Sequence, residues 1–268
     1  MRETAYAKIN LALHVRARRE DGYHDLETLF AFVDAGDELS AIPADADRVA
    51  TLGPFAGGID DPFDNLVAQA LSVLPRRGGL DVTLEKNLPV AAGLGGGSAD
   101  AGAVFRMVES ACGLPEDWLE RAAKLGADVP SCVRSETAIG RGTGTALEPV
   151  DNDLAGTPVL LVNPREPLAT GPVFKAWDGE DRGPLPSGSA REIAMAGRND
   201  LDAAAQGLCP AIGQVLTELD AGDAWLSRMS GSGATCFALY DTNAARDHAL
   251  RRITDERPDW WLLAGNLR

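Results

Sequence analysis

The sequence predicts an α+β fold with two domains, and three observations lead to this expectation. The 268 residues approach the size at which a single hydrophobic core stops growing and chains divide into domains. Strand-like alternation and helix-like periodicity of apolar residues occur in both halves of the chain. A glycine-rich loop near residue 95 separates one predicted strand from one predicted helix. We place the domain boundary near residue 150, which gives domains spanning 1–150 and 151–268.

Local signals define the elements of the first half. Ile9, Leu11 and Leu13 alternate along a first strand, Pro75 ends a helix, and Gly113 follows the end of another. In chain order we expect strands at 3–18, 26–33, 38–42, 48–52 and 80–85, and helices at 65–74, 98–112 and 115–125.

The second half continues the mixture of strands and helices. Its segment 178–190 is polar and rich in Gly, Pro and Ser, so we expect a loop there, and no motif in it indicates a role. We expect strands at 158–162, 225–229, 234–240 and 260–263, and helices at 171–177, 210–219 and 242–253.

The composition is that of an acidic globular protein. Asp and Glu number 40 against 25 Lys and Arg, which gives a formal net charge of −15. Such a surface repels nucleic acid and anionic lipid, so neither is expected as a partner, and a phosphate ligand needs a local arrangement of donors. No apolar run approaches the roughly 20 residues that span a bilayer, and no secretory signal is recognised, so a cytoplasmic location is expected. The sequence does not indicate the oligomeric state.

Cysteine and histidine do not indicate a metal site. The four cysteines, Cys112, Cys132, Cys209 and Cys236, share no ligand spacing such as C-x-x-C, and the three histidines complete none. We therefore expect no metal-ligating residues of this kind, and reduced thiols that pack as small apolar side chains.

The most informative segment is the glycine-rich loop at 89–102. Four glycines within five residues permit positive φ and close approach of the backbone to a ligand, and the following helix contributes its N-terminal dipole, so the loop can hold phosphate groups. It is not a Walker A loop, because G-x-x-x-x-G-K-[ST] is absent, and Ser98 replaces the third glycine of a dinucleotide motif. We expect Ser98 to be the helix N-cap, with its hydroxyl available to a phosphate or Mg²⁺. A flexible surface turn is the alternative.

Three segments resemble the GHMP kinase superfamily. The loop matches its phosphate-binding pattern P-x-x-x-G-L-G-S/G-S/G-S/A, residues 6–11 match its first-strand motif, and residues 229–237 match its C-terminal glycine motif. The resemblance implies an ATP-dependent kinase with Mg²⁺ on the phosphates, an N-terminal domain similar to the second domain of ribosomal protein S5, and a ferredoxin-like C-terminal domain. It assigns ATP binding to Pro89, Val90, Ala91, Ala92, Gly93, Leu94, Gly95, Gly96, Gly97, Ser98 and Ala99.

The run at 18–30 narrows the resemblance to one branch of the superfamily. Its pattern R-x-D-G-Y-H-x-L-x-T-L-F resembles the branch of the superfamily that phosphorylates the 2-hydroxyl of 4-diphosphocytidyl-2-C-methyl-D-erythritol in the non-mevalonate route to isoprenoids. The substrate would then be a small molecule, a cytidine diphosphate-linked methylerythritol. We expect substrate contacts from Asn10, Tyr23, His24, Thr170, Phe174, Gly231, Ser232 and Gly233.

Aromatic rings and an imidazole suit a cytidine ligand. Tyr23 and Phe174 offer stacking surfaces, and His24 can donate to or accept from the edge of the base. A structural role is the alternative for each: a half-buried turn residue for Tyr23, a surface histidine for His24, core packing for Phe174, and a plain hairpin turn for Gly231-Ser232-Gly233.

Lys8 and Asp128 are the catalytic pair that the resemblance assigns. Lys8 lies in the first-strand motif, and Asp128 lies in G-A-D-V-P at 126–130. A carboxylate can accept the proton of the acceptor hydroxyl as the bond to phosphorus forms, and a fixed ammonium can stabilise the developing negative charge. The alternatives are a helix or turn cap for Asp128 and a solvated strand lysine for Lys8.

Three other functions stay open. A different GHMP kinase, for homoserine or mevalonate, would not need the R-x-D-G-Y-H run, and a non-catalytic nucleotide-binding protein would not need both Lys8 and Asp128. A nucleic-acid-binding module conflicts with the net charge.

One departure from the family is Gly102, where alanine is common. A glycine weakens a helix by up to about 1 kcal/mol, and we expect no effect on the chemistry.

Overall fold

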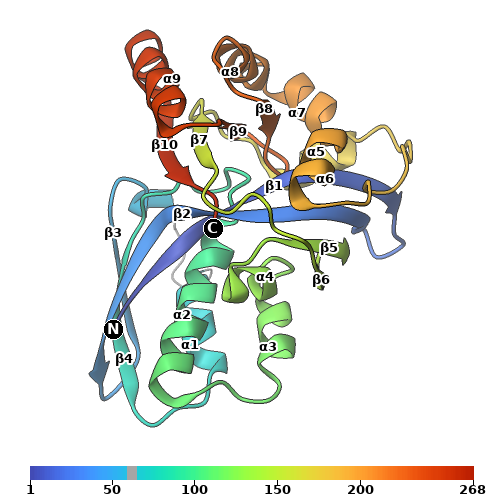
Figure 1. Ribbon diagram of the computed structural model, residues 1–268. Coiled ribbons are helices and arrows are strands. Elements are labelled where there is room, and N and C mark those ends of the chain that lie inside the picture. The colour runs from blue at the N-terminus through green and yellow to red at the C-terminus, as the bar shows by residue number, and fades with distance from the viewer. Residues whose placement is uncertain (59–64) are drawn as a thin grey trace. The chain divides into compact units, whose positions relative to one another are not determined.

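The computed structural model describes residues 1–58 and 65–268 (Figure 1). The described chain forms two compact units, each made of separate stretches of sequence. The first unit comprises Met1–Lys8, Ala35–Val90 and Gly95–Ser135, and the second comprises Ile9–Asp34, Ala91–Leu94 and Glu136–Arg268. Two long strands, β1 (Arg2–Arg18) and β2 (His24–Ala44), contribute residues to both units. The division of the chain into domains at residue 150 stays a prediction.

Within the described residues, the first unit combines strands with four α-helices and one 3-10 helix. Strand β4 (Gly79–Glu85) pairs antiparallel with β2, with Leu39 opposite Leu84, and parallel with β3 (Arg48–Leu52). Alternate residues of β4 are buried, as its apolar alternation predicts. The helical elements are η1 (Ala56–Gly58), α1 (Leu66–Val73), α2 (Gly96–Cys112), α3 (Trp118–Leu125) and α4 (Val129–Arg134).

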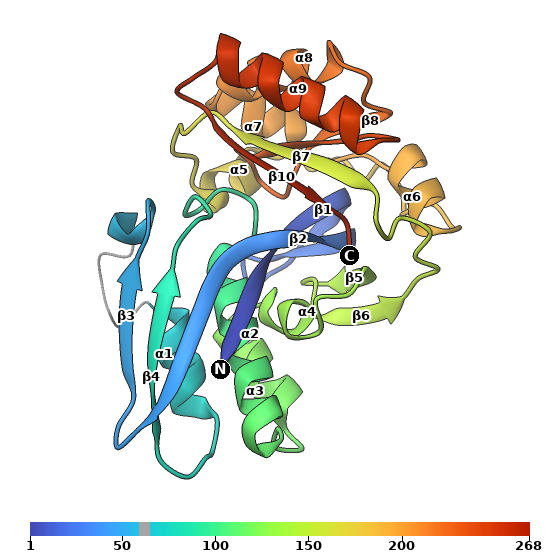
Figure 2. The same cartoon turned by 60° about the vertical axis from the view of Figure 1, so that its left-hand side comes forward.

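The second unit contains an antiparallel sheet in the order β10-β7-β9-β8, one face of which is covered by α8 and α9 (Figure 2). Every residue of β7 (Pro158–Asn163) is buried, which explains its continuous apolar sequence. The other strands of this sheet are β8 (Leu226–Met229), β9 (Cys236–Leu239) and β10 (Trp261–Asn266). The helices are α5 (Thr170–Ala176), α6 (Ala190–Ala196), α7 (Asp202–Leu208), α8 (Ala211–Asp220) and α9 (Asn243–Glu256). Strand β5 (Ala138–Gly142) pairs with the first part of β2 and with β6 (Ala146–Pro149).

The α+β prediction is confirmed, and the elements differ from those expected in a few places. Strand β2 is continuous, whereas two strands separated by the segment 34–37 were predicted. Asp37 in that segment is in fact fully buried. The short helices α4, α6 and α7 and the strands β5 and β6 were not predicted, since elements of four to seven residues carry little periodic signal.

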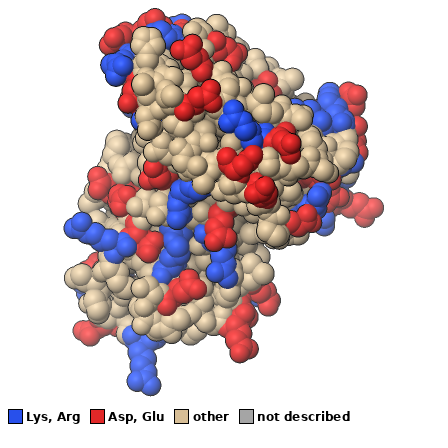
Figure 3. Space-filling view, in the orientation of Figure 1, with Lys and Arg blue, Asp and Glu red and all other residues tan. Residues whose placement is uncertain are grey.

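The surface carries acidic and basic side chains interspersed over the face drawn in Figure 3. The acidic excess in the sequence is therefore spread among basic residues on this face rather than gathered into one patch. Over the described ranges, 1–58 and 65–268, no helix has both the length and the apolar composition needed to cross a bilayer.

Candidate active site

Lys8 and Asp128, the predicted catalytic pair, contact each other within the first unit. The Lys8 ammonium donates to Oδ2 of Asp128 at 2.9 Å. Lys8 lies on β1 and is 4% exposed, so it is not a solvated strand lysine. The Asp128 side chain is 36% exposed, so it can reach a bound hydroxyl while Lys8 holds it from the buried side.

The position of Asp128 directly before α4 does not explain the contacts of its carboxylate. Asp128 is the N-cap residue of α4, yet its carboxylate makes no capping hydrogen bond to any described residue of the helix. A capping aspartate would accept from the N–H groups of the first helical turn. The carboxylate contacts Lys8 instead, which is the arrangement that a general base next to a charge-stabilising ammonium requires.

Gly102 permits the helix packing that places Asp128. A Cβ atom at Gly102 would lie 2.6 Å from the carbonyl carbon and oxygen of Cys132 in α4, closer than real Cβ contacts come. Glycine therefore lets α2 and α4 approach closely, and α4 begins directly after Asp128. This gives the glycine a role that the sequence did not reveal, where only a weakened helix was expected.

The N-terminus of α2 lies beside two lysine side chains of the first unit. Its N-cap is Gly95 at φ 61°, and no side chain in the described part of the chain caps it. A Cβ atom at Gly95 would lie 3.1 Å from Cε of Lys8, and one at Gly96 would lie 3.4 Å from Nζ of Lys86. The first N–H groups of a helix have no intrahelical acceptor. Together with the helix dipole and two ammonium groups, they suit a phosphate ligand.

The expectation that Ser98 caps this helix is wrong. Gly95 adopts the left-handed conformation, so the first helical hydrogen bond runs from the Ala99 N–H to the Gly95 carbonyl at 2.8 Å. Ser98 lies in the first turn, and its Oγ would be 3.9 Å from a Cβ atom at Gly126. A serine at the N-cap would satisfy one of the N–H groups internally, whereas a glycine leaves them available to a ligand.

A buried ionic triad lies beneath the start of α2. Nζ of Lys86 donates to Oδ2 of Asp37 at 2.5 Å and to Oδ2 of Asp100 at 2.8 Å, and all three side chains are at most 3% exposed. Oδ1 of Asp37 accepts from the N–H groups of Asn87 and Leu88, the two residues before the glycine-rich loop. The triad therefore fixes both the entry to the loop and the first turns of the helix that follows it.

Burial controls the ionisation of this triad. Desolvation, together with the negative charge of Asp37, raises the pKa of Asp100 to about 7 against the attraction of Lys86. One ammonium can neutralise one carboxylate, so the second carboxylate retains a proton more readily than an exposed aspartate does. No sequence signal indicates this triad, because its members are separated by 49 and 14 positions and match no motif.

Residues Ala91–Leu94 of the loop contact the C-terminal glycine motif within the second unit. The Ser230 hydroxyl donates to the Gly93 carbonyl at 2.7 Å, and the Thr235 N–H donates to the Ala92 carbonyl at 3.2 Å. Gly93 has φ 76°, and a Cβ atom there would lie 2.4 Å from the Ser230 carbonyl oxygen. The motif therefore does more than reverse the chain, because it holds the centre of the loop.

The predicted polar substrate residues of the second unit gather at this same motif. Nδ2 of Asn10 donates to the Thr28 hydroxyl at 2.7 Å, and the Asn10 N–H donates to the Ser230 hydroxyl at 3.2 Å. The hydroxyls of Thr170 and Ser232 are 3.0 Å apart. Gly231 and Gly233, on either side of Ser232, have φ 57° and 86°.

His24 and Phe174 also meet in the second unit. Their ring centroids are 4.9 Å apart, and the ring of Trp177 lies edge-on to His24 at 5.8 Å. Burial lowers the pKa of His24, and the nearby positive charge of Arg18 lowers it further, so the imidazole is neutral near pH 7. Nε2 of His24 and Nε1 of Trp177 are buried and have no hydrogen-bond partner among the described residues. Arg18 and Trp177 were not predicted, because neither lies at a motif position.

Tyr23 is the one predicted aromatic without a ring contact recorded in the described part of the chain. It is 64% exposed, and its N–H donates to Oδ1 of Asp21 at 3.0 Å in the turn between β1 and β2. The ring is therefore accessible to a ligand, and the half-buried position considered from the sequence is not observed. Its role in stacking stays a prediction.

Comparisons with known proteins identify the family of the chain. The model for the GHMP kinase N-terminal domain matches residues 65–136, and that for the GHMP kinase C-terminal domain matches residues 188–259. A 4-diphosphocytidyl-2-C-methyl-D-erythritol kinase of Erythrobacter litoralis is 67% identical over 99% of both chains. The chain belongs to this family of GHMP kinases. A kinase of the same name from Novosphingobium aromaticivorans is 69% identical over 100% of this chain and 93% of its own.

A solved structure of the same family agrees with the fold. The crystal structure of a 4-(cytidine 5′-diphospho)-2C-methyl-D-erythritol kinase has a TM-score of 0.83 and 34% identity, and the match covers 100% of this chain and 99% of the other. The two-domain GHMP kinase fold expected from the sequence is thereby confirmed. As a GHMP kinase, the chain is a small-molecule kinase that uses ATP.

Proposed function

We propose that this kinase transfers the γ-phosphate of ATP to the 2-hydroxyl of 4-diphosphocytidyl-2-C-methyl-D-erythritol, a step in the non-mevalonate pathway to isoprenoid precursors. The names of its relatives support this substrate. The observation that carries the chemistry is the 2.9 Å contact between Lys8 and Asp128, with the alkyl chain of Lys8 against the N-cap of α2.

In this proposal Asp128 acts as the general base. Its carboxylate accepts the proton of the 2-hydroxyl while the oxygen attacks the γ-phosphorus in line with the leaving ADP oxygen. Lys8 donates to Asp128 in the absence of substrate, and its fixed charge stabilises negative charge that develops on the acceptor oxygen and the phosphoryl group. The phosphate passes directly from donor to acceptor.

The glycine-rich loop is proposed to hold the phosphates of ATP, with the N–H groups of Gly96 and Gly97 at the start of α2, which have no intrahelical acceptor, as donors. No cluster of three acidic, histidine or cysteine side chains suited to a metal occurs in residues 1–58 and 65–268. An Mg²⁺ ion would be held mainly by phosphate oxygens and water, with the Ser98 hydroxyl as a nearby protein ligand. When bound, the ion would neutralise charge on the phosphates.

Tyr23, His24 and Phe174 are proposed to bind the cytosine. A neutral imidazole offers one donor and one acceptor to the base edge, and its lowered pKa keeps it in that form. Asn10, Thr170 and the motif Gly231-Ser232-Gly233 are proposed to contact the remainder of the substrate. We further propose that the enzyme acts in the cytoplasm, where ATP is available.

The test is a transfer assay with radiolabelled ATP and three separate acceptors: 4-diphosphocytidyl-2-C-methyl-D-erythritol, homoserine and mevalonate. We expect label only on the cytidylyl compound, and loss of transfer in Asp128→Asn. Mass spectrometry or phosphorus NMR of the product would locate the new phosphate. Turnover of homoserine or mevalonate would contradict the substrate, and ATP binding without any transfer would indicate a non-catalytic protein.

A further inference from the structure

Alternate side chains at the end of β1 bind the end of α5 and the segment that follows it. His14, Arg16 and Arg18 are spaced two residues apart, so they project from the same face of the strand. They bond to the segment in reverse order: His14 to Gly183, Arg16 to Asp181, and Arg18 to the end of α5. We call this set of contacts the β1 side-chain ladder.

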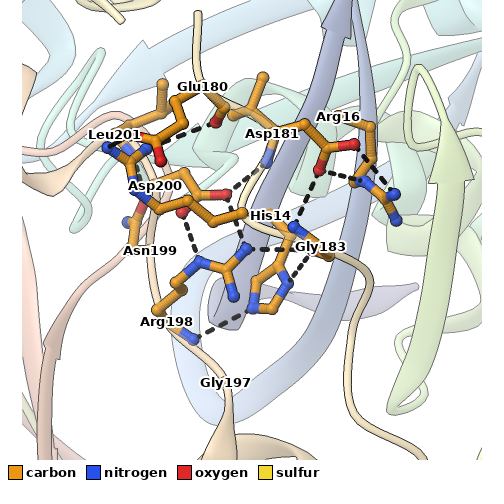
Figure 4. A network of polar contacts seen from close by, with 12 residues as sticks. His14, Arg16, Glu180, Asp181, Gly183, Gly197, Arg198, Asn199, Asp200 and Leu201 are labelled. Carbon is orange, nitrogen blue, oxygen red and sulfur yellow. Dashed lines mark hydrogen bonds and ion pairs between the residues drawn. The ribbon is translucent and has the colours of Figure 1, made fainter. Parts of the chain in front are cut away.

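His14 forms the buried end of the ladder (Figure 4). The Arg198 N–H donates to Nε2 of His14 at 3.2 Å, so Nε2 carries no proton, and Nδ1–H donates to the Gly183 carbonyl at 3.0 Å. The guanidinium of Arg198 also donates to this carbonyl, at 3.0 Å, and to Oδ1 of Asp200 at 2.6 Å. Because His14 is fully buried and both ring nitrogens are bonded, this rung fixes Gly183 firmly.

Arg16 forms the middle rung. Its Nε and one terminal nitrogen donate to the two carboxylate oxygens of Asp181 at 2.8 and 3.1 Å, and its other terminal nitrogen donates to Glu27 at 2.9 Å. The second oxygen of Glu27 accepts the Leu185 N–H at 2.9 Å. The side chains of Arg16 and Asp181 are 28% and 43% exposed, so water weakens the attraction between their charges. The pair contributes mainly to orientation, because two parallel hydrogen bonds fix Asp181 relative to Arg16.

Arg18 forms the rung next to the cytosine residues. One of its terminal nitrogens donates to the Trp177 carbonyl by a short hydrogen bond and to the Lys175 carbonyl at 3.2 Å. These carbonyls lie at the C-terminus of α5, where a helix leaves carbonyl groups without intrahelical partners and favours a positive charge. The guanidinium also lies 5.7 Å from the centre of the Trp177 ring.

We propose that Arg18 is a positioning residue for the nucleobase. It holds the C-terminal end of α5, so that the rings of Phe174 and His24 keep their positions relative to each other. This inference rests on the proposed function, because it takes these two rings as cytosine contacts. Phe174 lies on α5, while His24 begins β2 on the other side of the turn that follows Arg18. Arg18, at the end of β1, thus binds α5 to the strand that the turn joins to β2.

The opposite end of α5 shows why its orientation matters. Thr170 opens the helix and contacts the Ser232 hydroxyl at 3.0 Å. A helix of seven residues spans about 10 Å, so a small tilt at one end moves the Phe174 ring relative to His24. The sequence indicated no role for loop 178–190. In the structure this loop follows α5 and is bound by His14 and Arg16, so it limits the movement of the C-terminal end of α5.

The test compares Arg18→Gln with Arg246→Gln in the full chain. Arg246 lies in the same unit and also donates to a backbone carbonyl, that of Gly265, at 2.8 Å, so its replacement is a matched control. KM is measured for the cytidylyl substrate and for ATP, together with kcat. Binding of cytidine 5′-diphosphate is measured by calorimetry, and thermal unfolding is recorded for each protein.

For Arg18→Gln we expect KM for the cytidylyl substrate and Kd for cytidine 5′-diphosphate to rise up to about tenfold, because only a fraction of the unliganded protein then holds the two rings in the binding arrangement. KM for ATP and kcat at saturation should stay within about twofold, and Arg246→Gln should change none of these constants. Arg16→Gln should raise the same two constants by a smaller factor, and it decides the question if Arg18→Gln does not fold.

An unchanged Kd for cytidine 5′-diphosphate, or equal rises in KM for both substrates, would overturn the inference while leaving the proposed function intact. A wild-type chain that neither binds cytidine 5′-diphosphate nor phosphorylates the cytidylyl substrate would overturn both. The two failures are distinguished by the wild-type measurement alone.

Discussion

The Lys86 triad contains two aspartates, and replacing Asp37 by asparagine is expected to change the stability of the protein in the opposite direction to replacing Asp100. Asp37 accepts from Lys86 through Oδ2 and from the N–H groups of Asn87 and Leu88 through Oδ1. Asp100 accepts from Lys86 through Oδ2, and its buried Oδ1 has no hydrogen-bond partner within the described ranges. Asp100 is therefore the member of the triad that takes up a proton.

The pKa of Asp100 sets the magnitude. It rises from 3.8 to about 7 in the folded protein, chiefly through burial. Below about pH 4 both states hold the proton, and stability is unaffected. Between about pH 4 and about pH 7 the unfolded chain releases it first, so the free energy of unfolding falls, by up to about 4 kcal/mol at about 1.4 kcal/mol per pKa unit. Asp100→Asn removes this loss.

Asp37→Asn should instead destabilise the protein by about 3–5 kcal/mol, the range for breaking a buried ion pair. Urea unfolding at about pH 6 and about pH 8 measures both variants, with the change in free energy taken from the linear extrapolation. At the higher pH we expect Asp100→Asn to equal or exceed the wild type. Asp47→Asn is the control, because Asp47 also accepts a backbone N–H, from Leu80 at 2.9 Å, and pairs with an arginine in the same unit.

The control carboxylate is 38% exposed, so Asp47→Asn should lose at most about 1–2 kcal/mol. If Asp100→Asn loses as much stability as Asp37→Asn at the higher pH, the assignment of the proton to Asp100 is wrong. If neither variant differs from Asp47→Asn, the triad contributes no more than a surface pair, and its place beneath the loop has no energetic importance.

Three further predictions concern the catalytic pair, a helix contact and a buried histidine. Asp128→Asn should lower kcat by about 10²- to 10⁴-fold with little change in KM for ATP, and a loss below tenfold in steady-state assays would remove Asp128 as the base. Gly102→Ala should lower the free energy of unfolding by about 1–3 kcal/mol, because its Cβ would lie 2.6 Å from the Cys132 carbonyl, and an equal or raised melting temperature would contradict this. Burial lowers the pKa of His14 from 6.5, so its contribution to stability is complete above about pH 6.5 and declines below it as the unfolded chain takes up the proton first. His14→Asn should therefore reduce the loss of stability between about pH 7 and about pH 5 in urea unfolding, and an identical pH dependence would show that His14 does not contribute.

The sequence predicted the parts of the molecule that depend on local signals. The strand at 48–52, the all-buried strand β7 and the helices beside the glycine-rich loop follow from periodicity, Pro and Gly. The resemblance to a known family selected Lys8 and Asp128, which lie 120 positions apart and contact each other at 2.9 Å. No periodic signal alone would have paired them.

What the sequence missed depends on contacts between distant residues. Asp37 falls between the strands predicted at 26–33 and 38–42, and its burial inside one continuous strand depends on Lys86, which lies opposite it. Ser98 looked like an N-cap by residue type, but the backbone of Gly95 decides where α2 begins. Arg18 gave no signal because its carbonyl partners, at the end of α5, are more than 150 positions away.

The acidic surface has a consequence for how quickly substrates arrive. ATP and the proposed cytidylyl acceptor are both anions, and they approach a chain with a formal charge of −15. The long-range field therefore repels them, and the short-range donors at the start of α2 attract them. Because salt screens charges beyond about 10 Å at 0.1 M, moderate ionic strength should speed encounter and raise kcat/KM. The enzyme would then work faster in a salty medium than in a dilute one, the reverse of enzymes that steer anions inward by a basic surface.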